Sequence, residues 1–195
     1  MYITGNMGAN LSAASDESLL ENLQGGSHEA FTELVNRHSR RFFGLAYRLV
    51  ANKSDAEDIV QDAFLKLWNR PRLWNPGRQA KFTTWFYRVV INLCLDHKKK
   101  RRPLSLSEDV DPVDANPGQD ALLDVHQKQA ILEKFICELP ERQQLALNLC
   151  FYEGLSNEQA AEIIGVKVKA LQSLLMRAKT TLKDKAKRFL DGGST

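Results

Sequence analysis

One face of a helical pattern near the end of the chain carries side chains that could contact DNA. Amide, hydroxyl and cationic groups can hydrogen-bond to base edges in a groove or to phosphate oxygens. The candidates on this face are Lys169, Ala170, Gln172, Ser173, Met176 and Arg177. The chemistry that they predict is non-covalent recognition of a nucleic acid.

The sequence contains no pattern typical of an enzyme. It holds no nucleophile beside a base, no acid–base dyad, no phosphate-binding glycine loop and no metal-ligand cluster. We therefore expect no catalytic residue, no cofactor and no bound metal.

Two helices joined at a glycine are needed to position the DNA-contacting face. Ser156 and Gln159 form a capping-box pattern that starts a short helix, and Gly165 ends it. The next helical pattern has an apolar stripe on the side away from the candidates, at Leu171, Leu174, Leu175, Ala178 and Leu182. This arrangement predicts a helix-turn-helix.

An ordinary helical hairpin with a solvated outer face is the alternative for this segment. Ala160 and Ala161 are small where the two helices must cross, and Met176 is apolar on the outer face. Both features favour DNA binding over a purely solvated surface.

Charge is distributed unevenly along the 195 residues. Residues 1–102 have 16 Lys and Arg against 10 Asp and Glu, residues 103–120 have five acids and no base, and residues 121–195 have 11 bases and nine acids. The middle segment also holds three prolines, which is typical of an extended, self-repelling linker. A hydrophobic content of 43% describes a soluble globular chain.

All the periodic segments have helical spacing, so we expect an all-α fold of two small domains. The first would span residues 27–102, with helices after Ser27, from the capping box of Ser54 and Glu57 to Asn69, and from Lys81 to about Lys98. An acidic flexible linker at 103–120 would join it to a second domain at 121–190. Residues 1–26, with a short helix at 16–24, and residues 191–195 would form the tails.

Acidic and apolar side chains alternate on the outer face of the second long helix. They are Asp58, Gln61, Asp62, Leu65 and Trp68. A solvated face with two stray hydrophobic residues and a docking surface for a basic partner both fit this pattern.

Aromatic and basic side chains lie together in the third helix, which runs into the basic stretch KKKRR at residues 98–102. Rings that stack on bases beside cations that neutralise phosphates suit single-stranded nucleic acid. Most of these rings must nevertheless belong to the core, and a basic run can simply be a solvated helix end.

The three cysteines, Cys94, Cys137 and Cys150, are odd in number, widely spaced and within apolar helical patterns. We expect reduced core thiols in a cytoplasmic protein. Neither a signal-peptide pattern nor an apolar run of membrane-spanning length occurs in the sequence.

Three segments, taken in order, carry a resemblance to a known family: DAEDIVQDAFLKLW at 55–68, NPGRQAKFTTWFYRVVINLCLDHKKKRR at 75–102, and LPERQQLALNLCFYEGLSNEQAAEIIGV at 139–166. They resemble the polymerase-docking segment, the promoter-melting segment and the start of region four of a bacterial RNA polymerase sigma factor of the extracytoplasmic-function (ECF) class. The resemblance covers residues 27–190. Within the class we also expect similarity to the cobalt–nickel resistance sigma factor, although no motif indicates metal regulation.

The resemblance implies partners and site residues. Core RNA polymerase would bind Asp58, Gln61, Asp62, Leu65 and Trp68. The minus-ten element of the promoter would be contacted by Lys81, Phe82, Thr84, Trp85, Arg88 and Asn92. The minus-thirty-five element would be contacted by the helix-turn-helix face from Lys169 to Arg177, and an anti-sigma factor would hold the chain inactive.

The sequence departs from the family where Gln172 and Leu174 stand, since a basic residue is common at these positions. Gln172 could still pair with adenine, but Leu174 removes a possible phosphate contact. Two other functions remain open: a stand-alone helix-turn-helix regulator and a helical adaptor protein with incidental basic surfaces.

Overall fold

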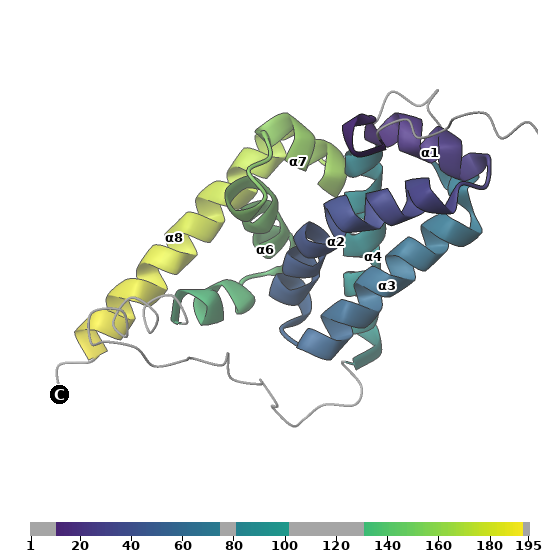
Figure 1. Cartoon of the computed structure of the whole chain (residues 1–195). Helices are drawn as coiled ribbons and strands as arrows, with labels where there is room; N and C mark the ends of the chain where they lie inside the picture. Colours follow the sequence, from purple (N-terminus) through teal and green to yellow (C-terminus); the bar gives the residue numbers. More distant parts are fainter. Residues whose placement is uncertain (1–10, 75–80, 102–130, 193–195) are drawn as a thin grey trace, which may run out of the picture.

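The computed structural model describes residues 11–74, 81–101 and 131–192, and within them every regular element is helical. The first half holds α1 (Asp16–Gln24), α2 (His28–Val50), α3 (Lys53–Asn69) and α4 (Phe82–Arg101). The second half holds a helical stretch at 131–137, α6 (Glu141–Leu147), α7 (Asn157–Ile164) and the long α8 (Val168–Gly192), as Figure 1 shows. Short 3-10 turns lie at Leu11–Ala13 and Pro71–Leu73, and a π-helical turn follows α6 at Asn148–Tyr152. The all-α prediction is confirmed; the linker at 103–120 lies outside the described residues.

Side-chain caps begin α1, α2 and α3. The hydroxyls of Ser15 and Ser27 accept hydrogen bonds from the backbone N–H groups of Ser18 and Ala30 and start α1 and α2 as predicted. The start of α3 differs from the prediction. The side chain of Asn52 accepts from the N–H of Asp55 at 2.9 Å, so the helix begins before Ser54. The capping residue is therefore Asn52, two residues before Ser54, and Ser54 lies inside the helix.

Aromatic rings fill the space between α2, α3 and α4. Phe42 lies with its ring centroid 4.7 Å from that of Phe86 and 4.9 Å from that of Tyr87, and Phe64 lies 4.9 Å from Phe86. Tilted and edge-to-face contacts at such distances favour a fixed arrangement of the three helices. This core determines which faces of α3 and α4 remain outside.

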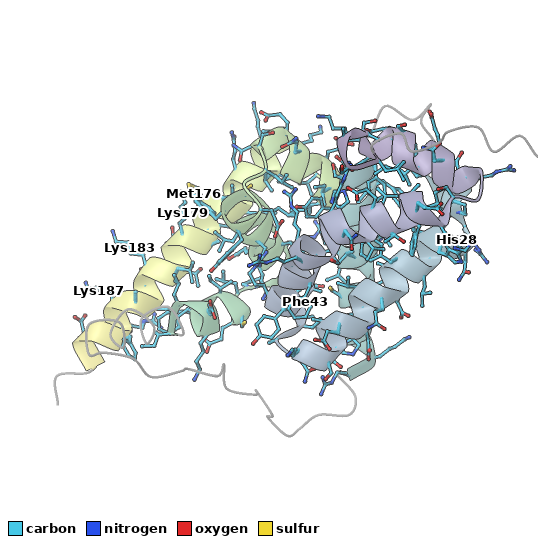
Figure 2. The ribbon with its side chains drawn as sticks, in the orientation of Figure 1. His28, Phe43, Met176, Lys179, Lys183 and Lys187 are labelled. Carbon is cyan, nitrogen blue, oxygen red and sulfur yellow. The ribbon has the colours of Figure 1, made fainter. Side chains whose placement is uncertain are left out.

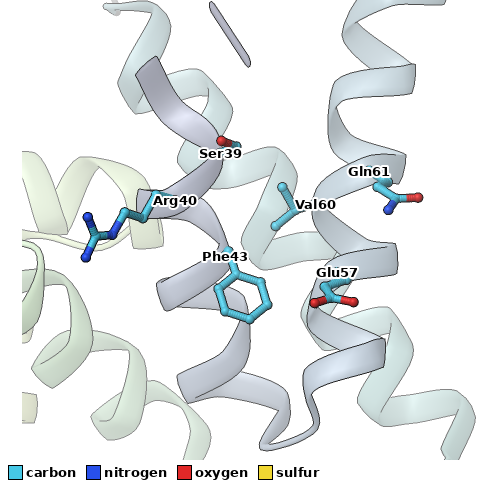
Figure 3. A pocket seen from close by; sticks show the side chains of 6 residues that line it. All are labelled: Ser39, Arg40, Phe43, Glu57, Val60 and Gln61. Atoms are coloured by element: carbon cyan, nitrogen blue, oxygen red, sulfur yellow. The ribbon is translucent and has the colours of Figure 1, made fainter. Parts of the chain in front are cut away.

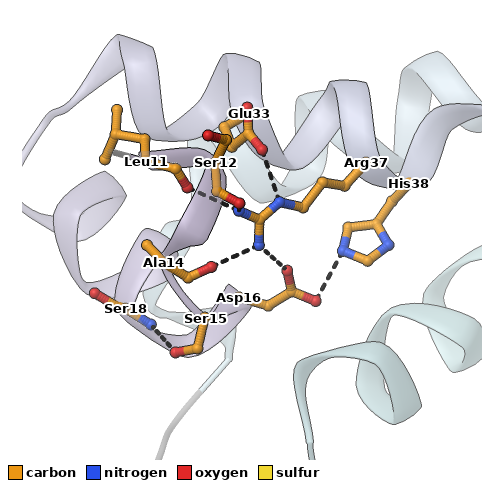
Figure 4. A network of polar contacts seen from close by, with 9 residues as sticks. All are labelled: Leu11, Ser12, Ala14, Ser15, Asp16, Ser18, Glu33, Arg37 and His38. Atoms are coloured by element: carbon orange, nitrogen blue, oxygen red, sulfur yellow. Dashed lines mark hydrogen bonds and ion pairs between the residues drawn. The ribbon is translucent and has the colours of Figure 1, made fainter. Parts of the chain in front are cut away.

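Arg37 of α2 connects the start of the described chain to the first half (Figure 4). Its guanidinium donates to the backbone oxygens of Leu11, Ser12 and Ala14 and to the carboxylates of Glu33 and Asp16. The other oxygen of Asp16 lies 2.8 Å from Nε2 of His38, which is buried. This partner on α1 explains how the polar ring of His38 is accommodated in the core.

Asp16→Asn should lower the free energy of unfolding at neutral pH by about 1–3 kcal/mol, because hydrogen bonds from charged groups are lost. The hydrogen bond with His38, and then Arg37, hold the pKa of Asp16 below its usual range. A depressed carboxyl pKa stabilises the fold above the unfolded value of about 3.9, and this contribution is lost as pH falls through the folded pKa. Urea unfolding at neutral and acid pH would measure it. Glu21→Gln, an exposed carboxylate on the same helix, should show no such difference between pH values.

The two halves pack directly against each other, a contact that was not predicted from the sequence. One apolar cluster contains buried residues of α1–α4 together with residues of the second half, among them Leu145, Leu149, Ala160 and Leu171. In Figure 1, α6 and α7 lie between α8 and the first half. Side chains from distant parts of the sequence, which no local pattern joins, make this contact.

The cysteines have three different environments. Cys94 is buried and Cys150 half-buried, but Cys137 is exposed, so the prediction of a core thiol is wrong for that residue. Burial raises the pKa of the Cys94 thiol to about 12, so this thiol stays protonated at neutral pH. None of the helices in the described ranges is both long and apolar enough to span a membrane.

Candidate nucleic-acid and polymerase interfaces

The helix-turn-helix is formed by α7 and α8. The capping box of Ser156 and Gln159 is present in both directions, and Gly165 ends α7 with a positive φ of 75°, a conformation that suits glycine. Ala160 and Ala161 are buried, as their position at the crossing requires. The local sequence signals therefore give the predicted pair of helices.

The outer face of α8 is open along its first half. All six predicted DNA-contacting residues are exposed, and the side chain of Met176 is 66% exposed. The hydroxyl of Ser173 donates to the backbone oxygen of Lys169 at 3.0 Å, which leaves its lone pairs free to accept. This face combines amide, hydroxyl, cationic and apolar groups without an intervening acid, as base readout requires.

The acidic face of α3 is also exposed. Asp58, Gln61 and Asp62 lie outside, and the side chain of Leu65 is 53% exposed. Trp68 is half-buried because its ring contacts His28 at 4.6 Å and Phe31 at 4.9 Å between centroids. The structure therefore groups the five predicted residues on one side of α3, with Trp68 fixed against α2.

A hollow of about 290 Å³ lies beside this face, between α2 and α3 (Figure 3). Its lining residues are Ser39, Arg40, Phe43, Glu57, Val60 and Gln61. Gln61 belongs both to the hollow and to the predicted docking residues. An open hollow with an apolar floor next to a charged rim can accept an anchor side chain of a partner protein.

The predicted minus-ten residues, Lys81 just before α4 and five residues within it, do not all reach the surface. Lys81 and Asn92 are exposed and Trp85 is half-buried, but Phe82 is fully buried and Thr84 is 8% exposed. The reason is that α4 packs against α2, α3 and α7, so it has apolar contacts on more than one side. In this arrangement Phe82 and Thr84 are not available to DNA.

Arg88, another predicted minus-ten residue, contacts α7. Its guanidinium donates to the backbone oxygen of Glu162 and lies 3.5 Å from the Glu162 carboxylate. Both side chains are nearly half exposed, at 41% and 49%. The helix-turn-helix half therefore occupies part of the surface through which α4 was expected to bind DNA.

Glu153, which was not predicted from the sequence, makes several polar contacts between the halves. Its side chain is only 4% exposed and accepts hydrogen bonds from Arg41 at 2.9 Å, from Arg48, and from the phenol of Tyr87 at 2.6 Å. Arg48 also donates to Asn148 at 2.8 Å. The spacing of Arg41 and Arg48, seven residues apart on one face of α2, is the signal that could have indicated a shared partner.

Electrostatics of the Glu153 contact favour the protonated phenol of Tyr87. Burial raises the pKa of Tyr87, and the adjacent Glu153 raises it further, so Tyr87 remains a donor at any ordinary pH. Burial lowers the pKa of Arg41 while Glu153 raises it, with a net increase. Two guanidinium groups of α2 and one neutral phenol of α4 thus donate to one carboxylate of the second half.

Two family profiles match the chain in the order that the three motifs predict. Sigma-70 region 2 matches residues 34–103, and Sigma-70 region 4 matches residues 129–182.

Relatives with known names have similar sequences. The RNA polymerase sigma-H factor of Pseudomonas aeruginosa is 32% identical over 90% of this chain and 95% of its own length. The ECF sigma-E factor of Escherichia coli K12 is 30% identical over 90% and 96%. The ECF sigma factor SigE of Mycolicibacterium smegmatis is 34% identical over 80% of this chain, which spans only 61% of that protein.

Two solved structures share the fold. CnrH in complex with the cytosolic domain of CnrY superimposes with a TM-score of 0.67 at 22% identity, covering 92% of this chain and 99% of CnrH. The sigma factor RpoE of Bartonella quintana, in complex with the anti-sigma factor NepR, gives 0.63 at 24% identity and covers 80% and 96%. At these identities the likeness concerns the fold alone. Together with the two regions and the relatives of similar length, it agrees with the sequence motifs: the chain belongs to the ECF sigma factors of the sigma-70 family, which are transcription initiation factors and not enzymes.

Proposed function

We propose that this chain binds core RNA polymerase and directs it to a specific set of promoters in the cytoplasm. The observation that carries the proposal is the simultaneous exposure of the acidic face of α3 and the first half of the outer face of α8. These are different surfaces, on different halves of the chain, and each fits a different macromolecule. A single protein that has both can connect polymerase to DNA.

The two halves would have separate tasks. The first, residues 27–102, would dock on polymerase through Asp58, Gln61, Asp62 and Leu65, with the hollow at Phe43 taking a partner side chain. The second, residues 121–190, would place the start of α8 in the major groove of the minus-thirty-five element. The sequence-specific contacts there would come from Gln172, Ser173 and Arg177.

Opening of the minus-ten element would be driven by binding and not by chemistry. Flipping a base out of the duplex costs a few kcal/mol because the base loses its stacking. Stacking on side chains of the first half and contacts in a pocket there would offset this cost. Among the predicted minus-ten residues, Lys81 just before α4 and Trp85, Arg88 and Asn92 within it have side chains at or near the surface for this purpose. The open strand would be selected because the protein binds it better than duplex DNA.

We also propose an anti-sigma factor as an inhibitory partner. The support is the pair of similar folds that were solved with bound partners, CnrH with CnrY and RpoE with the anti-sigma factor NepR. Such a partner would cover the acidic face of α3 or the outer face of α8.

Promoter-dependent run-off transcription is the test. Purified chain added to core polymerase should give a transcript from one start site on a promoter template, and core alone should give none. If the chain forms a stable dimer that binds DNA but not polymerase, it is a stand-alone regulator instead. If it binds proteins but supports no initiation on any template of a genomic library, it is an adaptor.

A further inference from the structure

The outer face of α8 continues well beyond the residues assigned to base reading. Lys183 and Lys187 lie on the same side of the helix as Lys169, Gln172, Ser173 and Met176, since 14 or 18 residues correspond to nearly whole turns. All of them are exposed. Figure 2 shows Met176, Lys179, Lys183 and Lys187 following one another along the outer edge of α8.

The length of this face exceeds what a groove can hold. From Lys169 to Lys187 the helix rises about 27 Å, at about 1.5 Å per residue, whereas the major groove is about 12 Å wide. Helix-turn-helix proteins contact bases with the N-terminal residues of the recognition helix. The second half of α8 must therefore leave the groove when the first half is inside it, and it then passes the sugar-phosphate backbone.

The side chains of that second half fit a polyanion. The helix has seven Lys and Arg and two Asp between Val168 and Gly192. Lys185 contacts the helical stretch at 131–137 through the ring of Phe135 and pairs with Glu138 just beyond it, so it is not part of the free face. Lys179 lies over the ring of Phe151 at 5.1 Å, and within the described residues Lys183 and Lys187 make no ion pair.

We propose that Lys183 and Lys187, with Lys179 beside them, bind the phosphates of duplex DNA that flanks the base-reading part of α8. This inference rests on the proposed function, because the start of α8 must enter the groove for its end to meet the backbone. The lysines supply affinity that is independent of sequence and orient the helix in the groove. Asp184, on the adjacent row, limits the contact to the lysine side of the helix.

The salt dependence of DNA binding tests the proposal. Each phosphate contact contributes about 0.9 to the slope of log K against log salt concentration. Lys183→Gln/Lys187→Gln in the full chain should make that slope shallower by about 1.8, and should weaken binding equally for promoter and unrelated duplexes. Fluorescence anisotropy with labelled duplexes at several NaCl concentrations would measure both.

Two matched variants control for net charge and for shape. Lys53→Gln/Lys66→Gln removes the same charge from exposed positions on α3 and should leave the slope unchanged. Lys183→Arg/Lys187→Arg keeps the charge and should keep the slope. The proposal is overturned if Lys183→Gln/Lys187→Gln leaves the salt slope of the wild type unchanged. It is also overturned if Lys53→Gln/Lys66→Gln changes the slope by the same amount. Either result would show that the lysine side of α8 is only solvated. If the wild-type chain and its polymerase complex bind no duplex at all, the proposed function fails first.

Discussion

Glu153→Gln is expected to shift the two halves of the chain toward a separated arrangement. The carboxylate is buried and all its side-chain hydrogen bonds go to α2 and α4, so the substitution removes contacts across the interface and none that the structure shows within the second half. The side chains of Arg41 and Arg48 are 41% and 26% exposed, so their charges stay partly hydrated, and the loss of their hydrogen bonds to a charged carboxylate costs about 1.5–3 kcal/mol. A change of that size shifts the equilibrium between closed and separated halves by a factor of at least about ten.

Distance measurements between labels on α3 and α8 would detect the separation. Glu162→Gln is the matched control, since its carboxylate pairs with Arg88 at 3.5 Å with both side chains nearly half exposed. A surface pair of this kind contributes about 0–1 kcal/mol, so the control should keep the wild-type distance. Equal distances in the two variants would show that Glu153 does not hold the halves together.

Asp58→Lys/Asp62→Lys is expected to weaken binding to core polymerase by at least about a hundredfold. Both carboxylates are exposed and no ion pair in the described structure uses them, so the fold does not depend on them. Reversal of two charges opposite a basic partner replaces attraction by repulsion. Affinity capture or fluorescence binding with core enzyme would measure the loss, and circular dichroism would verify the helices.

A second charge-reversed variant separates local docking from net charge. Glu21→Lys/Asp96→Lys changes the charge by the same amount at exposed positions on α1 and α4. It should bind polymerase nearly as the wild type does. If both variants lost affinity equally, or if Asp58→Lys/Asp62→Lys bound normally while folded, the acidic face of α3 would not be the docking site.

Local signals in the sequence predicted the helices and the helix-turn-helix well. The capping box at Ser156, the glycine at 165 and the stripe from Leu171 to Leu182 each act within a few residues, so they can be recognised without the tertiary structure. The prediction of Ser54 as the capping residue of α3 was wrong, because the side chain of Asn52 caps this helix instead. The same local rules placed the exposed faces of α3 and α8 correctly.

The contact between the halves could not be predicted in this way. Glu153 and Arg41 are 112 positions apart, and a lone carboxylate after an apolar helix has no distinctive pattern. The burial of Phe82 and Thr84 also depends on tertiary packing, because α4 has neighbours on several sides and its apolar surface is wider than one stripe. Periodicity identifies a helix more reliably than it identifies how many faces of that helix are covered.

The contact of Arg88 with the last turn of α7 has a consequence for the order of events at a promoter. A helix ends in carbonyl groups with partial negative charge, and one of them, that of Glu162, accepts a hydrogen bond from the guanidinium of Arg88. In the proposed function this guanidinium binds the melted strand. The outer face of α8 is meanwhile uncovered. A chain in this arrangement can engage the upstream double helix first, and the carbonyl must be displaced before the downstream strand takes its place.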